Sequence, residues 1–248
     1  MIASGAIVQR HRAAHTVLLL VAAAASALGN VLFAMRVPAS VVLPWWLTFL
    51  VLTIAAERLE MTRLMKRPPR AATLLYAAIG LLLAGDLLSA ARPEGVVPFG
   101  AALIAIAAWL FAFDMARRTI HTTGFSRFAA AGLLAGYGWL AVGGFCWAAS
   151  PLVDLDDLAL HAITLGFVFS MIFAHAPLIV PVIARVRMSY TPLFYLPLAL
   201  LHASVAWRAA APFLPGPQLY VAALLNAASI ALFVLTLLAS LGLKREHG

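Results

Sequence analysis

Two histidines in an almost wholly apolar stretch are the residues of this sequence best suited to chemistry. The stretch runs from Asp157 to Pro181 and contains His161 and His175. On an α-helix this spacing corresponds to about 21 Å along the axis and places both side chains within about 40° of one face. An ionisable side chain in an apolar span normally faces the interior of a helix bundle and marks a pathway or a site. We therefore expect a functional site on this span.

The elements that must position these histidines are predicted to be membrane helices. The chain has 248 residues, of which 64% are hydrophobic and 10% charged, a composition that excludes an ordinary soluble domain. An all-α polytopic bundle of about eight transmembrane helices, forming a single domain over residues 1–248, is the predicted fold. Each predicted span is near the length of about 20 residues that a spanning helix needs, and the second span is the shortest. The spans are residues 15–35, 41–56, 71–91, 96–115, 128–149, 158–182, 193–210 and 219–243.

The distribution of basic residues predicts the orientation of these spans. Three basic residues, Arg36, Arg92 and Arg208, fall on one side of the predicted topology. The others fall on the opposite side and are Arg10, Arg12, Arg58, Arg63, Lys66, Arg67, Arg70, Arg117, Arg118, Arg127, Arg185, Arg187, Lys244 and Arg245. Because Lys and Arg accumulate in cytoplasmic loops, we expect both termini in the cytoplasm and a multi-pass location in the bacterial inner membrane, surrounded by lipid. The same rule accounts for the net charge of +8, so no nucleic-acid partner is expected.

This topology predicts that several polar side chains share a depth in the outer half of the membrane. His161 lies about 6 Å below the outer end of the sixth span. His202 lies at a similar depth in the seventh span, and Asn30, Asp86 and Asn226 belong to the same layer. A second, weaker layer near the cytoplasmic face contains His175 and His15.

Neutral histidines on facing helices are suited to binding a metal or haem. Imidazole is a common ligand of haem iron and of copper, and a helix bundle can hold two such ligands. The predicted cofactor is haem b, with copper as a second candidate, and the predicted ligands are His161 and His202, with His175 as the third. Asp86, Asp157 and Asn226 are candidates for orienting the ligands through the second ring nitrogen. The alternative is that the histidines only hold the bundle together by hydrogen bonds.

Two further features allow more than one interpretation. Arg208 could pair with a haem propionate, whereas the interpretation that we favour is that it extends to the lipid headgroups. Pro177 and Pro181 mark either the end of the sixth helix or a kink within it.

The sixth span also resembles a known family. The run His161-Ala-Ile-Thr-Leu-Gly166, followed by Met171-Ile172, is similar to the H-A-x-T-x-G-x4-M-I signature of the NnrS family. Members of that family are bacterial polytopic membrane proteins associated with haem, copper and tolerance of nitric oxide. The resemblance implies that His161 is a haem or metal ligand, and that the function is nitric oxide tolerance or respiratory redox chemistry. A redox protein or a quinone would then be the partner.

Other classes of function remain open or are excluded. A small proton-coupled transporter could use His161, His175 and Asp86 as a relay, and a membrane assembly protein would need the histidines only for packing. No adjacent His-His pair or His-x-His sequence is present in a span, which excludes the catalytic subunit of a haem–copper oxidase. No Walker or dinucleotide motif is present, and the one cysteine, Cys146, excludes a cysteine-rich metal site.

Overall fold

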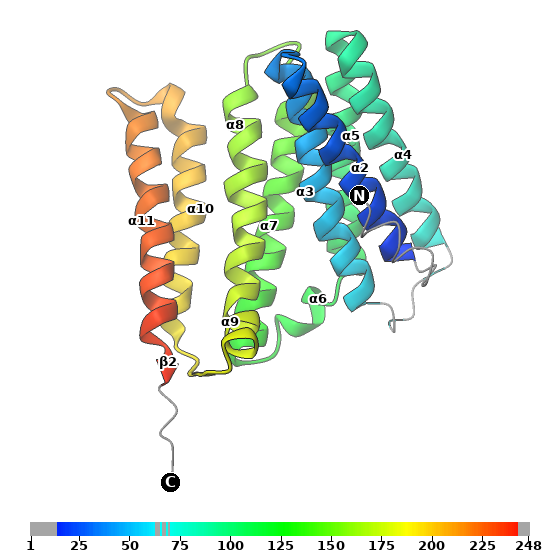
Figure 1. The fold of residues 1–248 in the computed structure, drawn as a ribbon. Coiled ribbons are helices and arrows are strands. Elements are labelled where there is room, and N and C mark those ends of the chain that lie inside the picture. The colour runs from blue at the N-terminus through cyan, green and yellow to red at the C-terminus, as the bar shows by residue number, and fades with distance from the viewer. Residues whose placement is uncertain (1–13, 63–64, 66–67, 69, 243–248) are drawn as a thin grey trace. The chain divides into compact units, whose positions relative to one another are not determined.

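Eight helices account for most of the chain in the computed structural model (Figure 1). The structure describes residues 14–62, 65, 68 and 70–242. Seven of the basic residues used for the orientation, Arg10, Arg12, Arg63, Lys66, Arg67, Lys244 and Arg245, lie outside these ranges. The eight helical stretches that are long and apolar enough to cross a membrane are Ala14–Ala34, Ala39–Met61, Arg70–Ala91, Val96–Phe113, Gly124–Ala149, Asp156–Ala184, Pro192–Phe213 and Gln218–Ala239.

The number and order of the predicted spans are therefore confirmed for the described residues, although some boundaries change. The second helix exceeds its predicted span by the largest number of residues, since it continues to Met61 and has 23 residues. The prediction that the last helix reaches residue 243 is wrong, because that helix ends at Ala239. Leu241 and Gly242 then form a short strand that pairs antiparallel with Arg187–Met188. The backbone groups of this segment are thus satisfied by a second strand rather than by one more helical turn.

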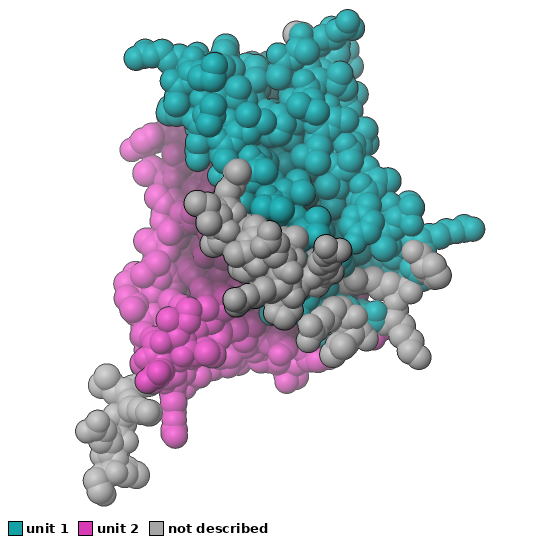
Figure 2. All heavy atoms as spheres, turned by 45° about the vertical axis from the view of Figure 1, so that its right-hand side comes forward, with its two compact units in different colours: residues 1–115, 140–159 teal, residues 116–139, 160–248 magenta. Residues whose placement is uncertain are grey.

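The chain divides into two compact units, coloured separately in Figure 2. Unit 1 comprises residues 1–115 and 140–159, and unit 2 comprises residues 116–139 and 160–248. The division passes through two of the long helices. The prediction of a single domain stays a prediction.

Unit 1 contains two helical hairpins (Figure 1). The first joins α2 (Ala14–Ala34) to α3 (Ala39–Met61), and the second joins α4 (Arg70–Ala91) to α5 (Val96–Phe113) through the 3-10 turn η1 (Pro93–Gly95). Small residues allow close packing in this unit, as expected for membrane helices. A Cβ atom added at Gly85 of α4 would lie 2.6 Å from the Cα atom of Phe99 in α5. The two helices of the second hairpin therefore touch at their backbones.

Unit 2 is built from the remaining helices and a small sheet. Its elements are α6 (Ala116–Thr119), the first part of α7 (Gly124–Ala149), the end of α8 (Asp156–His161), the π-helix η2 (Ala162–Phe169), α9 (Ser170–Ala184), β1 (Arg187–Met188), η3 (Pro192–Phe194), α10 (Tyr195–Ala210), η4 (Ala211–Phe213), α11 (Gln218–Ala239) and β2 (Leu241–Gly242).

Aromatic side chains form the core of unit 2. The rings of Phe173 in α9 and Phe233 in α11 are stacked with centroids 3.9 Å apart. Phe128 of α7 and Phe194 of η3 pack in the same buried cluster. These rings join four separate segments of the chain, so this core fixes the positions of the histidine-bearing helices within the unit.

Candidate functional site

The motif segment of the sixth helix adopts an unusual helical form. Residues Ala162–Phe169, which begin directly after His161, form a π-helix, and α9 continues from Ser170 to Ala184. The α9 helix passes through Pro177 and Pro181 without ending, so the frayed-end interpretation is wrong. Insertions of π-helix are rare and occur frequently at functional sites. The H-A-x-T-x-G sequence thus coincides with a local departure from the α-helix.

Hydroxyl groups satisfy carbonyls of this segment. The hydroxyl of Thr164 donates to the carbonyl of Leu160 at 2.8 Å, and that of Ser170 donates to the carbonyl of Gly166 at 2.6 Å. In a π-helix the backbone hydrogen bonds are shifted by one residue relative to an α-helix, so some carbonyl groups can lose their backbone partner. A carbonyl without a hydrogen bond in an apolar environment lowers the stability of the fold. The motif threonine therefore has a structural role that is local to the helix.

The motif glycine brings the sixth span against Trp139 of α7. A Cβ atom added at Gly166 would lie 2.6 Å from the Cβ atom of Trp139 and 2.9 Å from Cδ2 of its indole ring. Only glycine allows this approach. The indole N–H of Trp139 in turn donates a hydrogen bond to Nδ1 of His202 in α10, at 3.0 Å. Gly166, Trp139 and His202 therefore connect three helices of unit 2, and we call them the Trp139 cluster.

The hydrogen bond to Trp139 determines which nitrogen of His202 carries the proton. An indole N–H is only a donor, so Nδ1 of His202 must accept, and a neutral imidazole then carries its proton on Nε2. That Nε2 atom is buried and has no hydrogen-bond partner among the described residues. A metal ligand needs a free lone pair on the coordinating nitrogen, but here Nε2 carries the proton and the lone pair of Nδ1 accepts from Trp139. In the observed hydrogen-bonded state, His202 does not fit the role of a haem ligand.

His175 has the arrangement that His202 lacks. Its Nδ1 atom lies 2.6 Å from the carbonyl oxygen of Met171 in the preceding turn of α9. A carbonyl only accepts, so Nδ1 carries the proton and the neutral ring has its lone pair on Nε2. Histidine ligands of metals commonly donate their other ring N–H to a backbone carbonyl in this way. The half-buried His175 thus has the tautomer that is common among histidine ligands of metals.

The other predicted residues are distributed over both units. His161 is half-buried at the end of α8, and Asp157, one turn earlier, is exposed. Arg208 is 9% exposed, so its side chain packs within the protein. Asn226 is buried and its side-chain oxygen accepts a hydrogen bond from the hydroxyl of Ser204, which links α11 to α10. No group of three or more His, Cys, Asp or Glu residues suitable for a metal ion is present in the part of the chain that the structure describes.

Asp86 lies in unit 1, and its surroundings differ from those of the histidines. Its side chain is completely buried in α4, and Oδ2 accepts a hydrogen bond of 2.8 Å from the hydroxyl of Thr48 in α3. Its second oxygen, Oδ1, is buried and has no hydrogen-bond partner among the described residues. Burial of a carboxyl group with one oxygen that lacks a hydrogen bond lowers the stability of the fold. Asp86 is thus a second candidate functional residue.

Sequence reasoning missed Trp139 and Thr48. Trp139 had one recognisable signal, since it lies in the middle of a long apolar helix, whereas tryptophan in membrane helices is usually found near the ends. Thr48 had no signal, because threonine is common in such helices. The partners of both residues belong to other helices and were therefore not visible in the sequence.

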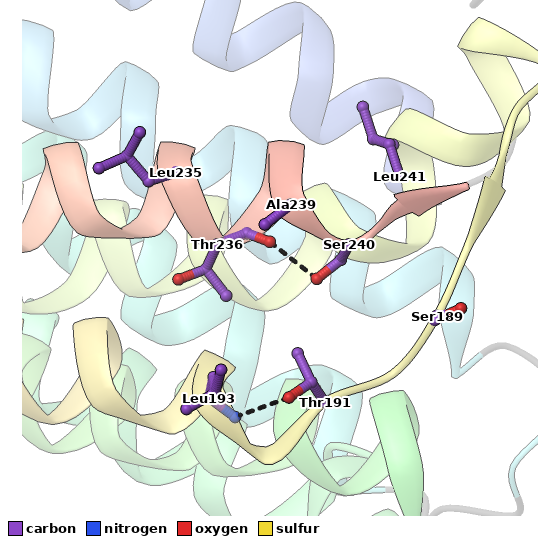
Figure 3. A pocket seen from close by; sticks show the side chains of 8 residues that line it. All are labelled: Ser189, Thr191, Leu193, Leu235, Thr236, Ala239, Ser240 and Leu241. Atoms are coloured by element: carbon purple, nitrogen blue, oxygen red, sulfur yellow. Dashed lines mark hydrogen bonds between the residues drawn. The ribbon is translucent and has the colours of Figure 1, made fainter. Parts of the chain in front are cut away.

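A pocket at the end of unit 2 is lined by hydroxyl and apolar side chains. It has a volume of about 590 Å³ and lies between the strand region and the end of α11 (Figure 3). The hydroxyl of Thr191 accepts from the backbone N–H of Leu193, and those of Thr236 and Ser240 donate to carbonyls one turn earlier in the chain. Three of the four hydroxyls that line it are thus used locally, and we do not assign chemistry to this pocket.

Fold and site together define an all-α protein with eight helices of membrane-spanning length and buried polar residues within them. Residues 1–241 match the family described as a domain of unknown function, DUF8744, and the chain belongs to this family. No curated protein and no solved structure matches the chain.

Proposed function

We propose that this chain is a multi-pass protein of the bacterial inner membrane that binds haem b through His175. The length and apolar character of the eight helices support the membrane location. The basic residues of the alternate loops support an orientation with cytoplasmic termini. A role in nitric oxide tolerance or respiratory redox chemistry follows from the resemblance of the sixth span to the NnrS family.

One observation carries the choice of His175 among the histidines. The hydrogen bond from its Nδ1 atom to the carbonyl of Met171, at 2.6 Å, places the lone pair of the neutral ring on Nε2, an arrangement common among histidine ligands of metals. His202 is held in the opposite tautomer by Trp139. His161 and His175 are separated by the whole π-helix and more than one turn of α9, and are therefore too distant to bind one iron together. His161 is therefore the ligand of a second group, such as copper, or has another role.

The haem would supply one-electron chemistry and, with a single protein ligand, an iron position for a small diatomic molecule. The protein's own contribution is the orientation of His175, since the carbonyl of Met171 fixes the ring and increases the basicity of Nε2.

The test is the absorption spectrum of the full chain, purified in detergent from haem-replete cells, before and after dithionite reduction. We expect a Soret band that is lost in His175→Ala and retained in His202→Ala. His121→Ala is the matched control, because His121 is exposed and lies outside the apolar spans. A colourless preparation, or a Soret band unchanged by His175→Ala, would refute the proposal.

A second candidate function, proton-coupled transport, has a separate observation in its favour. The unsatisfied Oδ1 atom of Asp86 lies in a helix of membrane-spanning length, and intramembrane carboxyl groups commonly serve as proton relays. The test is proton flux into proteoliposomes that contain a pH-sensitive dye. Asp86→Asn should abolish the flux, whereas Asp157→Asn, which changes an exposed carboxyl group, should not. Equal flux for both variants, or none above empty liposomes for the unmodified protein, would exclude this function.

A further inference from the structure

A second pocket of unit 2 combines one arginine with two tyrosines. It has a volume of about 500 Å³ and is lined by Ile120, Thr123, Gly124, Arg127, Ala131, Tyr190 and Tyr195. These residues come from the start of α7, the loop before it, and the segment that leads into α10. All of them belong to unit 2, so the geometry of the pocket is internal to that unit.

The positive charge of this pocket has no counterpart within the described part of unit 2. Residues 116–139 and 160–242 contain no Asp or Glu. Arg127 is exposed, and the structure holds no ion pair to it among the described residues. Arginine is also an unfavourable residue in the first turn of a helix, because the N-terminal end carries a partial positive charge. An anion bound beside Arg127 would offset both effects.

The tyrosines supply hydroxyl groups in fixed positions. The phenol groups of Tyr190 and Tyr195 lie close enough to interact with each other, and Tyr195 also lies near enough to Arg127 to feel its charge. Their rings are held by two phenylalanines of α7: Phe125 contacts Tyr190 and Phe128 contacts Tyr195, each with centroids 5.3 Å apart and edge-to-face geometry. Both tyrosines line the pocket, and a phenolic hydroxyl group can donate a hydrogen bond to a ligand.

We propose that this pocket binds a phosphate group, with Arg127 as the charged contact and the tyrosine pair as hydroxyl donors. Guanidinium matches the geometry of phosphate oxygens and binds them by paired hydrogen bonds. The phosphate can belong to the headgroup of an anionic phospholipid or to a soluble phosphate. Basic pockets between membrane helices on the cytoplasmic side commonly hold anionic lipid headgroups. This inference is independent of haem binding and of the role of Asp86.

The experiment compares ligands and variants on the full chain in detergent, with binding followed by native mass spectrometry and by titration. The ligands are phosphatidylglycerol, phosphatidylcholine and inorganic phosphate. The variants are Arg127→Gln and, as the matched control, Arg187→Gln. Arg187 is exposed in β1 of the same unit and does not line the pocket. Both variants remove one positive charge, so a difference between them reports the pocket and not the overall charge.

We expect phosphatidylglycerol to bind the unmodified protein, and Arg127→Gln to weaken that binding about tenfold or more, the effect of losing a hydrogen bond to a charged group. Arg187→Gln should change it less than about twofold, which is the range of a screened surface charge. Tyr190→Phe, which removes only a hydroxyl group, should weaken binding without affecting the fold. Phosphatidylcholine should bind more weakly because its headgroup has no net charge.

The comparison of phosphatidylglycerol with inorganic phosphate distinguishes the two sources of the phosphate group. Binding of inorganic phosphate that depends on Arg127 would assign the site to a soluble phosphate, whereas binding of phosphatidylglycerol alone would assign it to lipid. Equal weakening by Arg127→Gln and Arg187→Gln would overturn the proposal, because it would mean that only the overall charge matters. No binding of either ligand by the unmodified protein would overturn it as well.

Discussion

Replacement of Gly166 by alanine is the sharpest test of the Trp139 cluster. The added Cβ atom would lie 2.6 Å from the Cβ atom of Trp139, about 0.8 Å inside the ordinary contact distance of 3.4 Å. The Cβ atom of Trp139 is attached to the backbone and cannot rotate away, so α7 and the π-helix must separate or the indole must shift. Either movement displaces the hydrogen bond from Trp139 to His202.

The expected destabilisation follows from two terms. Forcing one methyl group into a packed site costs about 1–3 kcal/mol, and losing a hydrogen bond costs about 0.5–1.5 kcal/mol. We therefore expect Gly166→Ala to lower the free energy of unfolding by about 2–4 kcal/mol relative to a glycine-to-alanine change without steric effect.

Gly138→Ala is the matched control for this measurement. Gly138 lies in α7 of the same unit, and a Cβ atom added there would meet nothing within 4 Å. This variant should be neutral or slightly stabilised, because alanine favours a helix by up to about 1 kcal/mol over glycine. Unfolding in detergent, followed by tryptophan fluorescence and circular dichroism, measures both variants. Equal stability of Gly166→Ala and Gly138→Ala would refute the close packing of Gly166 on Trp139.

Substitutions at three further residues test single hydrogen bonds by the same unfolding assay. Trp139→Phe removes the donor to His202 and should destabilise by about 0.5–1.5 kcal/mol, since it removes a part-buried hydrogen bond; an unchanged midpoint would exclude this bond. Thr48→Val removes the donor to Asp86 and should cost a similar amount, whereas Thr48→Ser keeps the hydroxyl and should cost less; equal loss in both would indicate packing instead. Ser229→Ala removes the buried bond of 2.9 Å between α11 and the carbonyl of Pro197 in α10, and a loss below about 0.5 kcal/mol would contradict its contribution.

The fold was predictable to the extent that each helix carries its own signal. Length and apolar composition predicted the eight helices and most of their ends within a few residues. The error at residue 243 arose because the apolar run continues past Ala239, while the backbone of Leu241 and Gly242 pairs with Arg187 and Met188 instead. Strand pairing between distant segments leaves no mark on local hydropathy.

The candidate site was predictable only in part. The sequence indicated the sixth span and its histidines, and it also indicated Asp86 as a buried polar residue. It did not indicate that Trp139 binds His202, that Met171 orients His175, or that residues 162–169 form a π-helix. The pairing of His161 with His202 was inferred from equal depth alone, and it stays a prediction.

The sequence by itself determined which segments are helical and apolar enough to cross a membrane, because a helix satisfies its own backbone hydrogen bonds and its length and composition can be read along one dimension. The tertiary structure alone decided which polar atoms meet. The rotation of each helix about its axis and the close approach allowed at Gly166 determine that Trp139 contacts His202. The contact with Trp139 determines which ring nitrogen of His202 carries the proton.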